Sequence, residues 1–255
     1  MRIPEIVLHA GPISVPAHLL FESLAYAIGF AIYRRNRNRH GDILEPTTRS
    51  SVIVAAILGA AIGSKVLAWL EDPAALAGGF QAFWPGGKTI VGALLGGTVA
   101  VEWTKRRLDV RARTGDLFAV PIAAGIIVGR VGCLLGGVND HTAGNPASVP
   151  WAVDFGDGIP RHPTQLYDIL FLGALILLLQ RLESMRLANG DLYRLFLFSY
   201  LAWRLVIDFL KPDPAFAGLA SIQWCCLAGV FWYSRDIVRI ARELMAQRAR
   251  VTVNG

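Results

Sequence analysis

Apolar residues in this chain are gathered into blocks of about fifteen to twenty, close to the length that an α-helix needs to cross a bilayer. Lipid offers a backbone no hydrogen-bond partners, so a chain that enters it forms helices or a closed barrel. The blocks predict seven membrane-spanning helices, near residues 17–33, 50–70, 89–103, 117–137, 164–181, 191–210 and 219–234. The predicted fold class is an all-α, polytopic membrane helix bundle.

The composition agrees with this fold class. Of the 255 residues, 54% are hydrophobic and 17% are charged, with a mean hydropathy of +0.45, whereas soluble domains carry about a quarter charged residues. No linker or soluble segment separates the blocks, so residues 1–255 are predicted to form one transmembrane domain. The first sixteen residues are interrupted by prolines and do not resemble a cleavable signal peptide.

The connections between the blocks alternate in charge. Four of them are rich in Arg and Lys: "RRNRNRH", "TKRRLDVRAR", "RLESMRLANG" and the tail "RDIVRIARELMAQRAR". The connections 71–88, 138–163 and 211–218 hold only Lys88, Arg161 and Lys211 as Lys or Arg. The positive-inside rule places the basic connections in the cytoplasm, with the N-terminus outside and the C-terminus inside. The net charge of +6 is accordingly attributed to anionic headgroups rather than to nucleic acid. The tail is predicted either to lie on lipid or to extend the last helix.

Small residues recur four apart in the predicted spans, as at Gly59 and Gly63, Gly92 and Gly96, and Gly125 and Gly129. This spacing is typical of helices whose backbones approach closely in lipid. The three cysteines, Cys133, Cys225 and Cys226, do not form a disulfide framework, since the neighbouring pair is badly placed to bridge.

Three basic residues fall inside the apolar blocks without an evident route to water: Lys65, Arg130 and Arg204. A cation in a bilayer costs at least a few kcal/mol, so it is usually retained for a partner or a substrate. Asp208 follows Arg204 by one turn on the same face, and the two form either a self-neutralising pair or part of a larger site. Arginine donates two parallel hydrogen bonds to phosphate, so the three cations predict a site for a phospholipid headgroup.

A polar stretch, "RHPTQLYD" (161–168), stands at the start of the fifth span. Pro163 suits the first turn of a helix, and Gln165 then shares a face with Asp168. His162 lies near the predicted water boundary, where an imidazole can exchange protons at neutral pH. A cap with interfacial anchors explains Pro163 and Tyr167, but it explains His162 and Gln165 less well.

Four motifs in order resemble the bacterial prolipoprotein diacylglyceryl transferase family: "GALLGG" (92–97), "GRVG" (129–132), "RHPTQLYD" (161–168) and "YLAWRLVIDFLKP" (200–212). The resemblance covers nearly the whole chain. It implies an enzyme of the bacterial inner membrane that moves the diacylglyceryl group of phosphatidylglycerol to the cysteine thiol of a prolipoprotein lipobox and releases glycerol phosphate. It implies no cofactor and no metal.

The resemblance also assigns site residues. Those implied to bind substrate are Lys65, Gly129, Arg130, Gly132, Gln165, Tyr167 and Asp208. Those implied to act in catalysis are Asp140, His141, His162, Tyr200 and Arg204.

The chain departs from the family at the residue that matters for proton transfer. An essential histidine of the family, just before "GALLGG", is replaced by Val91. The acceptor of the thiol proton is therefore left open among His162, His141 and Asp140. Two other functions remain alternatives: a related transferase with a different acceptor, and a bundle that binds or translocates phospholipid without chemistry.

Overall fold

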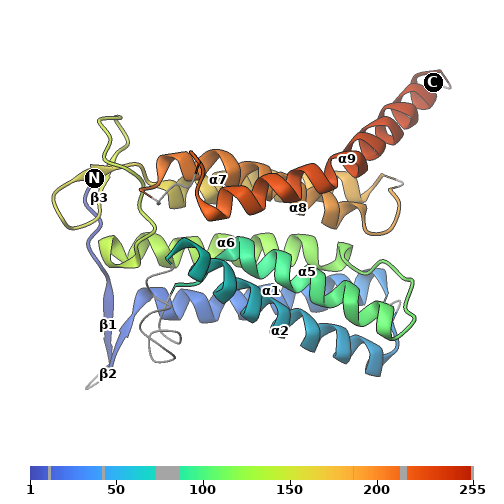
Figure 1. Cartoon of the computed structure of the whole chain (residues 1–255), viewed down its shortest axis with the longest axis horizontal. Helices are drawn as coiled ribbons and strands as arrows, with labels where there is room; N and C mark the ends of the chain where they lie inside the picture. The colour runs from blue at the N-terminus through green and yellow to red at the C-terminus, as the bar shows by residue number, and fades with distance from the viewer. Residues whose placement is uncertain (11–12, 42–43, 73–86, 186, 213–216, 254–255) are drawn as a thin grey trace.

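The structure is a computed structural model that describes residues 1–10, 13–41, 44–72, 87–185, 187–212 and 217–253. Its α-helices lie side by side along one axis (Figure 1). Their bounds are Ala17–His40 (α1), Pro46–Glu71 (α2), Ile90–Arg107 (α5), Asp116–Leu135 (α6), Thr164–Glu183 (α7), Asp191–Ile207 (α8) and Ser221–Val253 (α9). Each of the seven predicted ranges overlaps one of these helices, and the all-α prediction is confirmed.

α1 and α9 run furthest beyond the predicted spans, and α9 takes the predicted alternative in which the tail extends the last helix. α1 continues through its basic segment to His40, and α9 continues through the basic tail to Val253 as one unbroken helix that projects away from the bundle (Figure 1). Arg and Lys are good helix formers, so a charged sequence need not end a helix where the lipid ends. In the described part of the chain, α2, α6 and α7 are the helices that length and composition alone mark as able to cross a membrane.

Two of the predicted glycine pairs bring α2 and α5 together, whereas Gly129 of a third pair faces open space. α2 packs mainly on α5, where Gly59 and Gly63 face Gly92 and Gly96. A Cβ atom added at Gly96 would lie 2.8 Å from the Cα of Gly63, so the two backbones touch without side chains between them. Elsewhere α1 packs on α6, α6 on α7, and α8 on α9.

The bundle has an apolar inside and an apolar outside. Its core includes Leu94, Ala123, Leu172 and Leu201, each buried between helices. Ile62, Leu177 and Phe231 are 64%, 69% and 80% exposed on the outer surface. Large apolar side chains exposed all round a bundle indicate a lipid-facing surface.

Short strands and one 3-10 helix lie together at the N-terminal end of the bundle (Figure 1). Val7–Ala10 (β1) pairs antiparallel with Ile13–Pro16 (β2), and Val153–Asp154 (β3) pairs with Pro160–Arg161 (β4). The backbone N–H of Ile3 donates to the carbonyl oxygen of Asp154 at 2.7 Å, which fastens the N-terminus to the loop before α7. The 3-10 helix Gly137–Asp140 (η1) follows α6 directly, and a second, Asp208–Leu210 (η2), follows α8.

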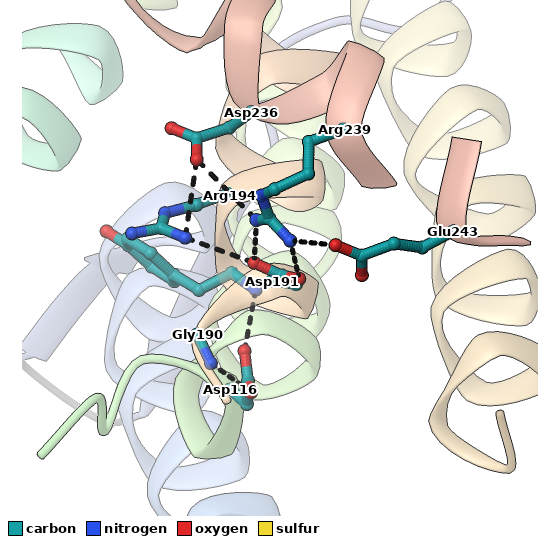
Figure 2. Close-up of polar contacts among 8 residues, drawn as sticks. Asp116, Gly190, Asp191, Arg194, Asp236, Arg239 and Glu243 are labelled. Carbon is teal, nitrogen blue, oxygen red and sulfur yellow. Dashed lines mark hydrogen bonds and ion pairs between the residues drawn. The ribbon is translucent and has the colours of Figure 1, made fainter. Parts of the chain in front are cut away.

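A cluster of charges at the other end of the bundle fastens α9 to the start of α8 (Figure 2). The Asp191 side chain is fully buried and accepts two hydrogen bonds from the Arg239 guanidinium, at 2.6 and 3.0 Å. Arg194 donates a third to it at 3.1 Å. Beside these contacts, the carboxylate of Asp116, at the start of α6, accepts hydrogen bonds from the backbone N–H groups of Gly190 and Tyr193, at 2.6 and 3.0 Å. No pattern in the sequence predicted this cluster.

Replacing Asp191 with asparagine is expected to loosen α9. The change keeps the side-chain shape but removes the charge that two guanidinium groups share, at a cost of about 1–3 kcal/mol in the free energy of unfolding. Thermal unfolding in detergent and tryptic cleavage after Arg239 measure the effect. Glu243→Gln is the matched control, because Glu243 is a half-exposed partner of Arg239 and exposed pairs contribute little. Equal stability of the two variants would contradict the proposed role of Asp191.

Candidate active site

Two arginines from different helices meet at one buried carboxylate. The Nε of Arg130 on α6 lies 2.7 Å from Asp168 Oδ2 on α7, and the Nη1 of Arg204 on α8 lies 3.8 Å from the same oxygen. The indole N–H of Trp203 donates to Asp168 Oδ1 at 2.7 Å. Arg130, Asp168 and Arg204 are each at most 6% exposed. Three helices thus converge on one ionic group deep in the bundle.

The ionic group continues toward the end of α8. Arg204 Nη2 lies 2.7 Å from Asp208 Oδ1, as their spacing in the sequence predicted, and Lys211 Nζ lies 3.4 Å from the same oxygen. Three cations against two carboxylates leave one net positive charge. In the described part of the chain, the hydroxyl of the fully buried Tyr200 and the Nε of Arg204 have no hydrogen-bond partner. A buried site with surplus positive charge and free donors favours an anion.

Lys211 makes the charge of this site depend on pH. Burial lowers the pKa of Lys211 to about 8, and the nearby Arg204 and Arg130 act in the same direction. Lys211 is therefore mostly protonated below pH 8 and mostly neutral above it, so affinity for an anionic phospholipid is expected to fall as the pH rises through this value. Loss of one charged donor corresponds to about tenfold in affinity.

Binding of phosphatidylglycerol, measured between pH 7 and 9, checks this expectation. Lys211→Arg is the control, because arginine stays protonated over the whole range. The variant is expected to bind with a flat pH profile, and a wild-type profile that is equally flat would contradict the assignment.

A second polar group lies where α1, η1 and α7 meet. Gln165 Nε2 donates to Thr142 Oγ1 at 2.9 Å, and Thr142 Oγ1 donates to Asp140 Oδ2 at 2.6 Å. The other carboxylate oxygen of Asp140 lies 2.6 Å from Nδ1 of His18, a residue on α1 that the sequence analysis did not single out. Thr164, at the start of α7, holds the loop that contains Thr142, since its hydroxyl donates to the Thr142 carbonyl at 2.7 Å.

His162 takes part in a different group. Its Nδ1 lies 3.2 Å from the Tyr167 hydroxyl, which also accepts from the indole N–H of Trp151 at 2.6 Å. His141, the other histidine of the loop, is exposed, and its backbone φ of 53° is left-handed. His162 and His141, two of the three predicted proton acceptors, therefore lie outside the polar group that contains Asp140.

The remaining predicted residues lie around these groups. A side chain added at Gly129 would meet open space, whereas one at Gly132 would meet Phe21 Cβ of α1 at 2.7 Å. Lys65 Nζ lies 3.5 Å from the Gly87 carbonyl, at the α2–α5 side of the bundle rather than against Asp168. Val91 is buried in the apolar core and offers no group that could accept a proton.

A metal ion could find one set of neighbouring donors in the described residues. One atom each of His18, Cys133 and Asp140 lie within 4.8 Å of one another. His18 Nδ1 lies 2.6 Å from Asp140 Oδ1, so two of these three donors already lie against each other beside the Cys133 thiol.

Comparison with known proteins identifies the family of this chain. The family model for prolipoprotein diacylglyceryl transferase matches residues 5–234. The phosphatidylglycerol–prolipoprotein diacylglyceryl transferase of Bordetella parapertussis is 31% identical over 240 residues, covering 88% of this chain and 90% of that protein. The protein of the same name from Solidesulfovibrio magneticus is 27% identical over 260 residues, covering 97% and 96%. A match over this much of the chain shows that this membrane protein belongs to the prolipoprotein diacylglyceryl transferase family of transferases.

Proposed function

We propose that this protein transfers the diacylglyceryl group of phosphatidylglycerol to the cysteine thiol of a prolipoprotein lipobox. The observation that carries the proposal is the buried cluster in which Arg130 and Arg204 share Asp168 and retain one net positive charge with Lys211 and Asp208. The names of the relatives supply the two substrates.

The cluster suits the phosphate of an anionic phospholipid. Transfer breaks the bond between the glyceryl carbon and a phosphate oxygen, so negative charge grows on the departing glycerol phosphate. Fixed guanidinium groups in a site of low dielectric constant stabilise such charge more strongly than water does. Arg130 and Arg204 take this role in the proposal, with Lys211 as a third cation and the Tyr200 hydroxyl as a neutral donor.

The flanking residues complete the proposed site. The open face beside Gly129 leaves room for part of the lipid next to Arg130. Gln165 and Tyr167 bind at the headgroup end, and Asp208 holds Arg204 in place. Lys65 is proposed to contact lipid at a separate position near Lys88.

The bundle is proposed to be one domain that crosses the bacterial cytoplasmic membrane seven times, with its N-terminus outside. The basic connections support this orientation because they meet at one end of the bundle. A crevice of about 230 Å³ is lined there by Asn36 and His40 at the end of α1, Arg113 before α6 and Asn189 before α8. The strands and η1 lie at the opposite end, with the N-terminus (Figure 1).

Reconstituted transfer tests the proposed function. The purified protein in phosphatidylglycerol vesicles is mixed with a synthetic lipobox peptide, and mass spectrometry is expected to show the mass of one diacylglyceryl group on the cysteine. A peptide with serine in place of cysteine is the control and is expected to remain unmodified.

Two outcomes would contradict the proposal. An unmodified peptide, from protein that still retains phosphatidylglycerol through purification, would favour a lipid-binding protein without chemistry. Modification of a different acceptor in membranes, with the lipobox peptide untouched, would favour a related transferase.

Rescue of a bacterial strain depleted of its own diacylglyceryl transferase is the expected result in cells.

A further inference from the structure

The imidazole of His18 and the carboxylate of Asp140 lie against each other although 121 residues separate them in the chain. His18 Nδ1 lies 2.6 Å from Asp140 Oδ1, and the Asp140 carboxylate is 8% exposed. Its second oxygen accepts a hydrogen bond from Thr142, which in turn accepts one from Gln165. The carboxylate is thus held in place by Thr142, and its negative charge beside Nδ1 favours the tautomer that carries the ring proton on that nitrogen.

This arrangement leaves Nε2 of His18 as an acceptor. The His18 side chain is 41% exposed, so the free edge of the ring can be reached from outside the bundle. The nearest charged atom to this edge that the structure identifies is Glu22 Oε2 on the same helix, at 3.9 Å. A carboxylate behind one ring nitrogen and a reachable second nitrogen are the geometry of a general base.

The His18–Asp140 pair also lies next to the buried cluster of Arg130, Asp168 and Arg204. Cys133 on α6 has its sulfur close to both His18 and Asp140, and the same sulfur lies 4.0 Å from Arg130 Nη1. Gly132 and Gly136 permit this approach. A Cβ at Gly132 would meet the His18 backbone at 3.3 Å, and a Cβ at Gly136 would meet Asp140 Oδ1 at 3.2 Å. The proposed base and the proposed phosphate site are therefore neighbours.

We propose that His18, oriented by Asp140, is the general base that accepts the proton of the acceptor thiol. The proposal rests on the proposed function. The thiol proton moves to His18 Nε2, and the sulfur forms a bond to the glyceryl carbon of phosphatidylglycerol. The bond from that carbon to the phosphate oxygen breaks, and its electron pair leaves with glycerol phosphate. The imidazolium then returns its proton to water.

The same role fits the other candidates less well. Asp140 accepts a hydrogen bond from Thr142 through one oxygen and has the His18 ring beside the other, so it serves as the positioning residue of the pair. His162 has its Nδ1 at the Tyr167 hydroxyl rather than at a carboxylate. Val91 is buried in the apolar core, so α5 offers no base at that position.

His18→Gln tests the proposal in the reconstituted transfer assay. Glutamine can still donate to Asp140 but is not a base, and loss of a general base reduces turnover by about 10²–10⁴-fold. The turnover number is expected to fall by that factor while retention of phosphatidylglycerol stays unchanged. His40→Gln is the matched control, an exposed histidine at the other end of the same helix α1, and it is expected to act like the wild type.

A lipobox peptide with selenocysteine in place of cysteine separates chemistry from folding. A selenol is ionised at neutral pH and needs no base, so this peptide is expected to restore turnover by His18→Gln. A variant that was merely misfolded would stay slow with both peptides, and that result would overturn the proposal.

Substitutions of Asp140 supply a further readout. The groups that face His18 are Asp140 on η1, Glu22 on α1 and Cys133 on α6, and Lys88 lies 3.0 Å from Glu22. Asp140→Asn is expected to lower turnover, with partial recovery in Asp140→Glu.

The outcomes distinguish the two proposals. Wild-type transfer together with an equally fast His18→Gln variant would overturn the role of His18 and leave the proposed function standing. A wild-type protein that transfers nothing would overturn both. Stoichiometric zinc in the purified protein, with activity that a chelator removes and zinc restores, would overturn the general base in favour of a metal site.

Discussion

Replacing Arg130 with glutamine is expected to lower the turnover number for transfer to the lipobox peptide by at least about a hundredfold. The guanidinium is proposed to stabilise charge that grows on the departing phosphate, and removal of one such donor in an enzyme costs about 10²–10³ in rate. Removal of Arg130 also leaves Asp168, 1% exposed, without its 2.7 Å partner. An uncompensated buried charge costs about 3–5 kcal/mol, so the single variant is expected to lose stability as well.

A double variant separates these two effects. Arg130→Gln combined with Asp168→Asn removes both charges and is expected to recover most of the lost stability, since no charge is left alone. Transfer is still expected to be absent. A double variant that transfers at the wild-type rate would show that the ion pair serves folding only.

Replacing Gly63 with valine is expected to prevent α2 and α5 from packing. A Cβ atom at this position would overlap the Gly92 carbonyl and lie 2.8 Å from the Cα of Gly96. Both are backbone atoms, which cannot turn aside as a side chain can, so the helices must separate. The expected cost is about 3 kcal/mol or more in the free energy of unfolding. Thermal unfolding of the detergent-purified protein measures it.

Gly173→Val is the matched control for this change. Gly173 lies within α7, and a side chain added there meets no atom within 4 Å. The control is expected to unfold within about 1 kcal/mol of the wild type, since the added side chain meets no neighbour and glycine and valine differ little in helix propensity. Similar unfolding temperatures for the two valine variants would contradict the close packing of α2 on α5.

The helices were predictable from the sequence because each one depends on the residues of its own segment. A block of apolar residues long enough to cross lipid has few alternatives to a helix, and α6 and α7 begin and end within two residues of the predicted ranges. The ends of α1 and α9 were not predictable, because a basic segment in water forms helix or coil with similar ease. The 24-residue α1 therefore ends at His40 rather than at residue 33.

Contacts within one helix were also predictable. Arg204 and Asp208 are four apart, so helical geometry places them on the same face, and the structure has them 2.7 Å apart. The glycine spacings likewise indicated where backbones approach. Such inferences need only the local period of the helix.

Contacts between distant segments were not predictable. Asp168 was placed on a face with Gln165, but nothing in the sequence identified Arg130 as its partner. His18 was missed for the same reason. An isolated histidine near the start of an apolar block is typical of an interfacial residue, and its meeting with Asp140 depends on how α1 packs on α6.

The most direct test of the account is the structure of the protein with phosphatidylglycerol in a lipid nanodisc. The account predicts the lipid phosphorus between the guanidinium groups of Arg130 and Arg204, with its oxygens within hydrogen-bond distance of both. A lipid phosphate found only beside Lys65 and Lys88, with the two arginines still closed on Asp168 and Asp208, would contradict it.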